Sequence, residues 1–220
     1  MTAEEHGLCG ACWSGTAFIT GAICDTCGAP VMGESHGEVL QCDDCIQTAR
    51  PWSRGRAVFL YRDIGRRLVL SFKHGDRLDL ARPAATWMAQ RVDEIVSPET
   101  LIVPVPLHWT RLVKRKYNQA SVLAQALGAK LGNCVLVDGL VRSTRTPSLD
   151  GKGRGDRFET LAQVIAPHPR RGGLMRDRQV LLVDDVMTSG ATLAACAEAA
   201  RGAGAVDVLT VTLARVAKDD

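Results

Sequence analysis

The sequence predicts an α/β fold in which helices cover both faces of a parallel sheet, preceded by a small cysteine-rich module. Short apolar runs alternate with amphipathic segments from about residue 100 onward, as expected for strands joined by helices. The three Cys-x-x-Cys pairs all fall within residues 1–50, where apolar periodicity is weak. With 220 residues, the chain is long enough for one main core and one appendage.

The composition is that of a folded globular protein. Apolar residues make up 46% of the chain and charged residues 23%, unlike the low hydrophobicity and high charge of disordered proteins. The net charge of +3 is too small to indicate a nucleic-acid partner by itself. No uninterrupted apolar window reaches the length of a membrane span, and the first residues lack a signal-peptide pattern. We therefore expect a cytoplasmic protein without membrane insertion.

The first half of the main domain is expected to hold one strand and two helices. Residues 57–61 form a short apolar run, which predicts the strand. Apolar residues at helical spacing predict helices over 64–72 and 79–96, and Pro83 suits the first turn of the second helix. Lys73 lies where the first of these helices ends, so its plain interpretation is a cation in the last turn, followed by a glycine cap at Gly75.

The second half repeats the strand and helix alternation. Strands are expected at 101–103, 134–137, 180–183 and 206–213, and helices at 118–131 and 191–202. A segment rich in Arg, Gly, Ser and Thr, from 142 to about 160, predicts a loop. Cys134 and Cys196 are expected to be small core residues, not nucleophiles.

The segment Val180–Thr192 carries the most informative motif. Two acids, Asp184 and Asp185, follow a buried strand at the sheet edge where ligands collect in α/β proteins. The small residues that follow could wrap an anion with their backbone N–H groups at a helix start. The acids could accept hydrogen bonds from ribose hydroxyls, or hold a divalent ion. The alternative is an ordinary strand end with a helix N-cap, but the length of the whole motif favours a sugar-phosphate site.

This motif resembles the 5-phosphoribosyl-1-pyrophosphate (PRPP) signature of type I phosphoribosyltransferases. The resemblance implies that Asp184 and Asp185 contact the ribose, that Thr188–Thr192 hold its 5′-phosphate, and that magnesium accompanies PRPP. The expected PRPP-binding residues are Asp184, Asp185, Val186, Met187, Thr188, Ser189, Gly190, Ala191 and Thr192.

Three further segments resemble one branch of that superfamily, the competence protein F (ComF) family. They are 102–120, which includes Pro104-Val-Pro106 and Tyr117-Asn118-Gln119-Ala120, then 70–77, and the cysteine-rich amino terminus. The resemblance implies a type I phosphoribosyltransferase fold plus an amino-terminal zinc ribbon. We expect a ribbon over 1–50 and a phosphoribosyltransferase-like domain over 51–220, with its core at about 100–216.

The resemblance also assigns two cationic loops. The loop after the first core strand would face the leaving pyrophosphate, and the loop from 142 to about 160 would be a hood that closes over PRPP. It further suggests that Lys73 reaches the site. The expected pyrophosphate-loop residues are Pro106, His108, Arg111, Lys114, Arg115 and Asn118, and those of the hood are Arg145, Lys152, Arg154 and Arg157. Read from the residues alone, the first loop is equally a solvated helix start, and the second could equally pass single-stranded nucleic acid.

The cysteine spacing predicts a structural zinc site. Cys24 and Cys27 form one knuckle and Cys42 and Cys45 a second, with the spacing of a four-cysteine zinc ribbon. Cys9 and Cys12 are left over. In the family that the chain resembles, such a pair is matched by an earlier Cys-x-x-Cys, and here only eight residues precede Cys9. We expect one zinc ion per chain, and an upstream half that was lost or lies before this start.

Together these expectations describe a ComF-like protein that binds PRPP or a related phosphoribosyl ligand with magnesium, linked to DNA uptake or nucleotide metabolism. Phosphoribosyl transfer is possible but no catalytic base stands out, so the sequence leaves catalysis open. Two alternatives stay open as well: a non-catalytic accessory that handles single-stranded DNA, and a ligand-sensing regulator on the same fold.

Overall fold

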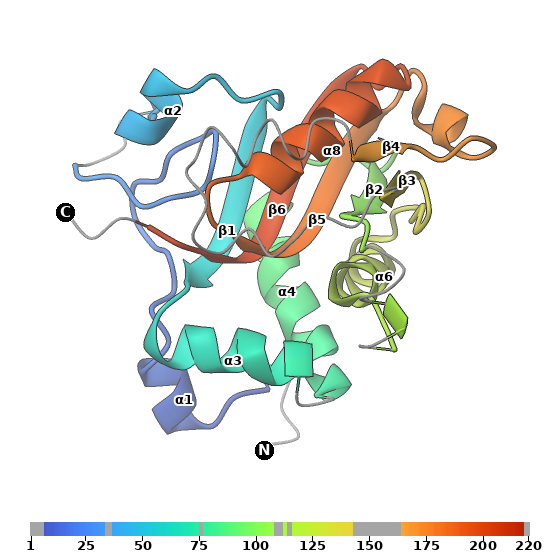
Figure 1. The fold of residues 1–220 in the computed structure, drawn as a ribbon. Coiled ribbons are helices and arrows are strands. Elements are labelled where there is room, and N and C mark those ends of the chain that lie inside the picture. The colour runs from blue at the N-terminus through green and yellow to red at the C-terminus, as the bar shows by residue number, and fades with distance from the viewer. Residues whose placement is uncertain are drawn as a thin grey trace.

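A four-stranded parallel sheet forms the centre of the computed structural model, which describes residues 7–33, 37–74, 77–107, 112–113, 116–142 and 164–217 (Figure 1). The strand order is β1-β6-β5-β2. The strands are β1 Arg54–Leu60, β2 Leu101–Pro104, β5 Gln179–Met187 and β6 Asp207–Arg215. All three pairings are parallel, so the carboxyl ends of these strands meet at one edge. β3 Leu140–Arg142 and β4 Ile165–Pro167 form a separate antiparallel pair.

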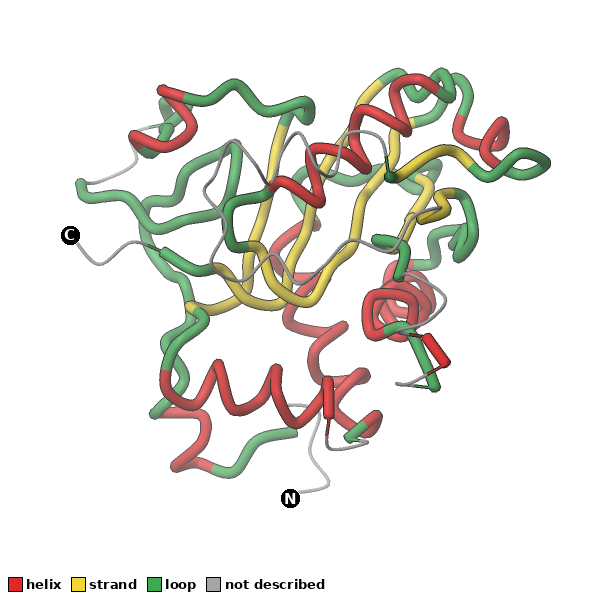
Figure 2. Tube along the Cα trace, viewed as in Figure 1, coloured by secondary structure: helices red, strands yellow, loops and turns green. Residues whose placement is uncertain are grey.

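Helices cover both faces of the sheet, as the alternation of segments predicted (Figure 2). Alternate strand residues point to opposite faces, so Val180 and Leu182 of β5 pack in the core with α8, while Leu181 and Val183 pack with α4 and α6. The longer helices are α3 Asp63–His74, α4 Ala81–Val92, α6 Gln119–Leu131 and α8 Ala191–Gly202. The short ones are α1 Gly10–Ser14, α2 Asp43–Gln47, η1 Leu78–Leu80 and η2 Gly172–Met175.

The caps of α6 follow from local sequence. The side chain of Asn118 accepts a hydrogen bond from the Ala120 N–H at 3.1 Å, which satisfies one of the free donors of the first turn. At the other end Gly132 adopts a left-handed conformation with φ of 77°, which ends the helix at low cost.

One predicted strand is wrong. Residues 134–137 make only an isolated parallel bridge, between Val135 and Ile102. This segment lies beyond β2, at the edge of the sheet, where it has a neighbour on one side only. Cys134 is exposed, which contradicts its expected place in the core, whereas Cys196 is fully buried as expected.

The cysteine-rich segment packs directly on the main core. Cys24, Cys27 and Cys45 are buried in the same hydrophobic cluster as residues of β5 and α8. β1 begins at Arg54, just after this segment. A domain boundary near residue 50 stays a prediction from sequence.

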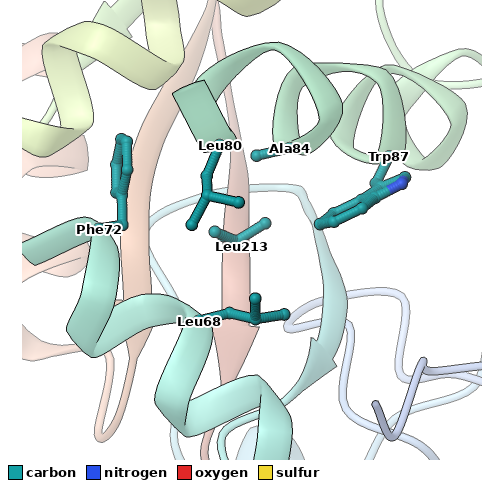
Figure 3. Close-up of a pocket in the computed structure, with 6 residues that line it drawn as sticks. All are labelled: Leu68, Phe72, Leu80, Ala84, Trp87 and Leu213. Atoms are coloured by element: carbon teal, nitrogen blue, oxygen red, sulfur yellow. The ribbon is translucent and has the colours of Figure 1, made fainter. Parts of the chain in front are cut away.

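A small apolar pocket lies on the opposite face, between α3, α4 and β6 (Figure 3). Its lining residues are Leu68, Phe72, Leu80, Ala84, Trp87 and Leu213. No charged side chain lines it, so it does not suit a phosphate. None of the described helices combines the length and the hydropathy needed to cross a lipid bilayer.

Candidate functional site

The two acids of the motif lie near the carboxyl end of β5. The strand continues through Met187, so Asp184 and Asp185 lie within it and do not close it as expected. Being adjacent in a strand, their side chains leave the backbone on opposite faces of the sheet. Asp185 forms an ion pair with Lys73 of α3, whereas Asp184 faces α8. In α8 the pKa of the Cys196 thiol is raised mainly by burial, and the charge of Asp184 adds to this effect.

Asp184 is an unusual carboxyl group. Burial raises its pKa to about 7, and repulsion from Asp185 adds to this, while the nearby cations Lys73 and Arg142 oppose it. One of its oxygens accepts the Asp185 N–H at 2.8 Å. The side chain keeps part of its surface in solvent. A half-buried carboxyl that is costly to ionise gains from a hydrogen-bond donor or a cation supplied by a ligand.

Lys73 reaches the site, as the family resemblance suggested. Its Nζ lies 3.0 Å from Oδ1 of Asp185, and both side chains are largely buried. Two residues at the start of α6 hold the end of α3 in place. The Tyr117 hydroxyl, just before α6, donates to the Phe72 carbonyl at 2.7 Å, and Nε2 of Gln119, the first residue of α6, donates to the Lys73 carbonyl at 3.3 Å. These two contacts give the Tyr117-Asn-Gln motif a positioning role.

The turn between β5 and α8 has its carbonyl groups bound by two arginines. Arg215 Nη1 donates to the carbonyls of Met187 at 3.3 Å and Thr188 at 2.7 Å, and Arg50 Nη1 donates to that of Ser189 at 2.8 Å. The described peptide bonds are all trans, so each following N–H points away from its carbonyl.

The N–H groups of Thr188, Ser189 and Gly190 therefore point away from the two arginines. Within the described parts of the chain, none of these three amides has a backbone acceptor. Gly190 precedes α8 with φ of 81°, a conformation that favours glycine. Successive free amides at the start of a twelve-residue helix form a cradle for an anion.

The remaining residues of the predicted loop have different surroundings. Met187 and Ala191 are buried. Val186, Ser189 and Thr192 are half-buried and Thr188 is exposed.

Of the expected pyrophosphate loop, the structure describes Pro106 and Asn118. Pro106 is half-buried. Both ends of the Asn118 amide are engaged in packing α6: besides capping the helix, its Nδ2 donates to the Val105 carbonyl at 3.0 Å. Its observed contacts are thus structural. The cationic residues assigned to this loop and to the hood lie outside the described residues: His108, Arg111, Lys114, Arg115, Arg145, Lys152, Arg154 and Arg157.

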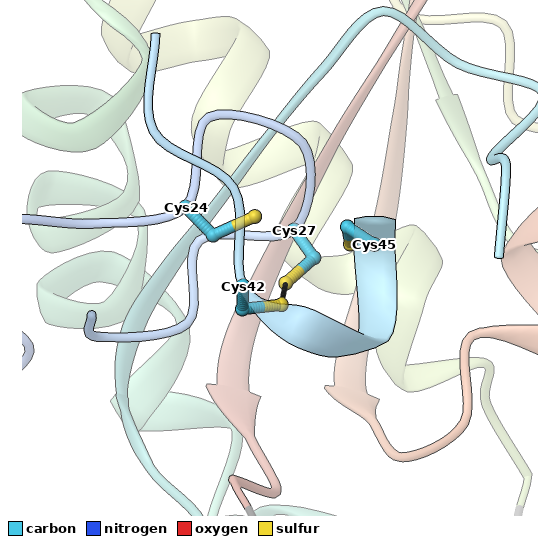
Figure 4. Close-up of side chains that lie close together, drawn as sticks. All are labelled: Cys24, Cys27, Cys42 and Cys45. Carbon is cyan, nitrogen blue, oxygen red and sulfur yellow. Dashed lines mark hydrogen bonds between the residues drawn. The ribbon is translucent and has the colours of Figure 1, made fainter. Parts of the chain in front are cut away.

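Four cysteines converge as their spacing predicted (Figure 4). The Sγ atoms of Cys24, Cys27, Cys42 and Cys45 all lie within 4.8 Å of one another. Cys27 and Cys42 are 3.6 Å apart, close to the roughly 3.8 Å expected between sulfurs that share a tetrahedral zinc ion with bonds of about 2.3 Å. Three of the four are buried.

The ionisation of these thiols also fits a metal. The pKa of Cys24 lies well below its usual value because the Cys27 and Cys45 thiols hydrogen-bond to it. The same hydrogen bonds raise the pKa of Cys27 to about 11 and that of Cys45 further. One thiolate thus suppresses ionisation of the neighbouring thiols. A bound cation would stabilise several thiolates side by side, because its positive charge offsets their mutual repulsion. The donor set, spacing and burial fit structural zinc.

Cys9 and Cys12 lie elsewhere. Cys9 is the N-cap residue of α1 and is exposed, and Cys12 lies within α1 and is half-buried. Neither joins the four-cysteine cluster.

Sequence reasoning missed three residues that shape this region: Arg50, Trp52 and Arg215. Each lies far from the motif in sequence, and none belongs to a recognisable pattern. The one available signal was an arginine within the mostly apolar run 211–217, where Arg215 stands.

Two domain families match the sequence. Residues 1–51 match the double zinc ribbon domain, and residues 115–219 match the phosphoribosyl transferase domain. Across nearly the whole chain it is similar to Competence protein F from Haemophilus influenzae, with 27% identity over 96% of this chain and 91% of that protein.

Two further relatives show the same extent of similarity. DNA utilization protein YhgH from Escherichia coli K12 is 28% identical, over 92% of this chain and 88% of the relative. Competence protein ComFC from Streptococcus pneumoniae is 24% identical, over 96% and 89%. The similarity therefore extends over both the cysteine-rich segment and the main domain.

Proposed function

We propose that this chain, which belongs to the competence protein F family, binds PRPP or a related phosphoribosyl ligand with magnesium at the carboxyl end of β5. The observation that carries the proposal is the turn after β5. Its three amides at Thr188, Ser189 and Gly190 are free of backbone partners in the described chain, and they follow two acids on the same strand.

The proposed roles follow from charge and position. The free amides and the amino end of α8 would receive the 5′-phosphate. Asp184 and Asp185 would accept hydrogen bonds from the ribose hydroxyls or contact the magnesium ion. Magnesium, when bound with the ligand, would neutralise charge on the pyrophosphate. Lys73 would hold Asp185 in place through its 3.0 Å ion pair.

Calorimetric titration tests this proposal. PRPP and ribose 5-phosphate, each with magnesium, are titrated into the zinc-loaded protein, its Asp184→Ala variant and its Asp185→Ala variant. We expect binding by the wild type and its loss in both variants. Asp207→Asn is the matched control, because Asp207 lies at the amino end of β6, at the opposite edge of the sheet. Equal affinity in all four proteins, or no binding by the wild type, would exclude the site.

The enzyme form of this proposal is phosphoribosyl transfer. A base or amine acceptor would form a bond to C1 of the ribose while the bond from C1 to the pyrophosphate oxygen breaks. Pyrophosphate would leave with the electron pair of that bond, and the proton lost by the acceptor nitrogen would pass to solvent. We expect PRPP-dependent release of pyrophosphate that requires Asp184 and Asp185. Binding without turnover for any acceptor would leave a ligand-binding protein without transferase activity.

A second candidate function is handling of single-stranded DNA. The names of these relatives concern competence and DNA utilization. In this chain, Arg170, Arg171 and Arg176 are all exposed within one short segment after β4. Phosphate contacts by such residues predict DNA affinity that falls steeply as salt rises. Binding that is absent or insensitive to salt in a fluorescence-anisotropy titration would remove this candidate.

A further inference from the structure

Arg215 joins the cysteine cluster to the turn after β5. It lies at the end of β6, is only 3% exposed, and its Nη1 donates to the Met187, Thr188 and Val216 carbonyls. Its Nη2 contacts Sγ of Cys27 at 4.0 Å. One buried guanidinium thus touches both a metal-site sulfur and the backbone of the proposed phosphate loop, and its planar shape fixes their relative positions.

A second connection runs through Arg50 and Trp52. The Arg50 guanidinium, which binds the Ser189 carbonyl, lies 5.6 Å from the ring centroid of Trp52. Trp52 is buried, and its Nε1 donates at 2.6 Å to the carbonyl of Thr26, inside the first cysteine knuckle. An added Cβ at Gly190 would lie 3.1 Å from Arg50 Nη1 and 3.3 Å from the Trp52 ring. The backbone of the loop at Gly190 therefore packs directly against these two side chains.

The knuckle itself is fitted closely to the sheet. A Cβ on Gly28 would lie 2.5 Å from the Ala57 nitrogen of β1, so only glycine allows this approach. Any loosening of the knuckle would therefore move the Thr26 carbonyl and the Cys27 sulfur relative to β1 and β6.

We propose that Arg215 and Arg50 are positioning residues through which metal binding at the cysteine cluster holds the phosphate loop in its binding conformation. For the ligand, the inference rests on the proposed function. When the four thiolates bind zinc, Cys27 and Thr26 have fixed positions, and the two arginines transfer that order to three consecutive loop carbonyls. Loss of the metal releases both connections at once.

The test begins without any ligand. NMR-detected hydrogen exchange follows the amides of Val216 and Ala194, which donate to the Met187 and Gly190 carbonyls. The Val105 amide, bonded to the Val183 carbonyl, serves as the internal control. In zinc-loaded Arg215→Gln we expect the Val216 and Ala194 amides to exchange faster than in wild type. Chelation of zinc from the wild-type protein should have the same effect, and in both cases exchange of the Val105 amide should change little.

A ligand measurement completes the test. Zinc-loaded Arg215→Gln and Arg50→Gln should each bind ribose 5-phosphate about 10-fold more weakly than wild type, since each loses charge-assisted hydrogen bonds to the loop. Arg215→Lys should recover part of the affinity. Arg54→Gln is the matched control, because Arg54 pairs with Asp25 of the knuckle at 3.2 Å and is not among the residues that contact the loop.

The outcomes separate the two proposals. If wild type binds no phosphoribosyl ligand but the exchange pattern holds, the proposed function fails and the connection stands. If ribose 5-phosphate binds with equal affinity in wild type and both glutamine variants, and Val216 exchange is unchanged, the connection is refuted. If Arg215→Gln does not fold, the test uses Arg50→Gln, for which ribose 5-phosphate affinity and hydrogen exchange of the Ala194 amide are measured.

Discussion

Replacing Asp184 by asparagine should stabilise the protein while removing ligand binding. The pKa of Asp184 is about 7 in the folded protein, against 3.8 for an ordinary aspartate. The folded state therefore holds this proton more tightly than the unfolded chain, and wild-type stability decreases as pH rises through that interval. Asparagine keeps the oxygen that accepts the Asp185 N–H but carries no charge.

The size of the effect follows from those two values. A difference of about 3 between them corresponds to about 4 kcal/mol, which is an upper limit. Because the side chain keeps contact with solvent, screening reduces this, and we expect about 2 kcal/mol at pH 8. For a chain of this size that is an increase of about 4–8 °C in Tm.

Thermal unfolding of zinc-loaded protein in magnesium-free buffer measures the effect. The Tm difference between Asp184→Asn and wild type should increase from about pH 5.5 to about pH 7 and stay constant above that. The measurement starts at about pH 5.5 because protons compete with zinc for the thiolate ligands at lower pH. Asp185→Asn should give no such gain, because it leaves Lys73 without its partner carboxylate. A variant that is less stable than wild type at pH 8, or a gain independent of pH, would refute the reasoning.

Three further predictions concern the metal, the loop and the end of α3. Metal analysis should find one zinc per chain, and two would contradict the assignment of Cys9 and Cys12 as unligated. Gly190→Ala should lower stability by about 1–2 kcal/mol, because alanine disfavours the left-handed conformation and its Cβ would lie 2.7 Å from the Met187 side chain. The same variant should bind ribose 5-phosphate more weakly, and an unchanged affinity in calorimetric titration would count against the cradle. Tyr117→Phe should cost about 1 kcal/mol in denaturant unfolding through loss of the bond to the Phe72 carbonyl, and no change would show that water replaces it.

Sequence patterns predicted the sheet and helices well where burial repeats regularly. The expected bounds of α8 agree with the structure, because small apolar residues follow a glycine with φ of 81° and continue to Gly202. The strand expected at 134–137 was wrong, since four apolar or small residues predict burial but not a second hydrogen-bonding neighbour. Whether a segment joins a sheet depends on that neighbour, which a local pattern does not contain.

For the candidate site, sequence predicted the groups of the motif but not what holds them. The acids, the small-residue turn and the four cysteines are local patterns with known spacings. Arg50, Trp52 and Arg215 act through distant partners, and their contacts exist only in the folded chain. The position of Lys73 had two interpretations, and the structure favours the one in which it reaches Asp185.

The connections between the cysteine cluster and the turn after β5 also determine when the site can form. Arg215 and Cys27 are 188 residues apart in sequence, and Arg50 and Ser189 are 139 apart. During synthesis the cysteines emerge before the sheet, and β6, which completes their surroundings, emerges after the other three strands. We expect a nascent chain that lacks β6 to have no ordered turn after β5, and its thiols to stay accessible to oxidants or competing metals until β6 has been added. A premature stop codon shortly before residue 215 should therefore remove ligand binding while sparing every residue of the motif.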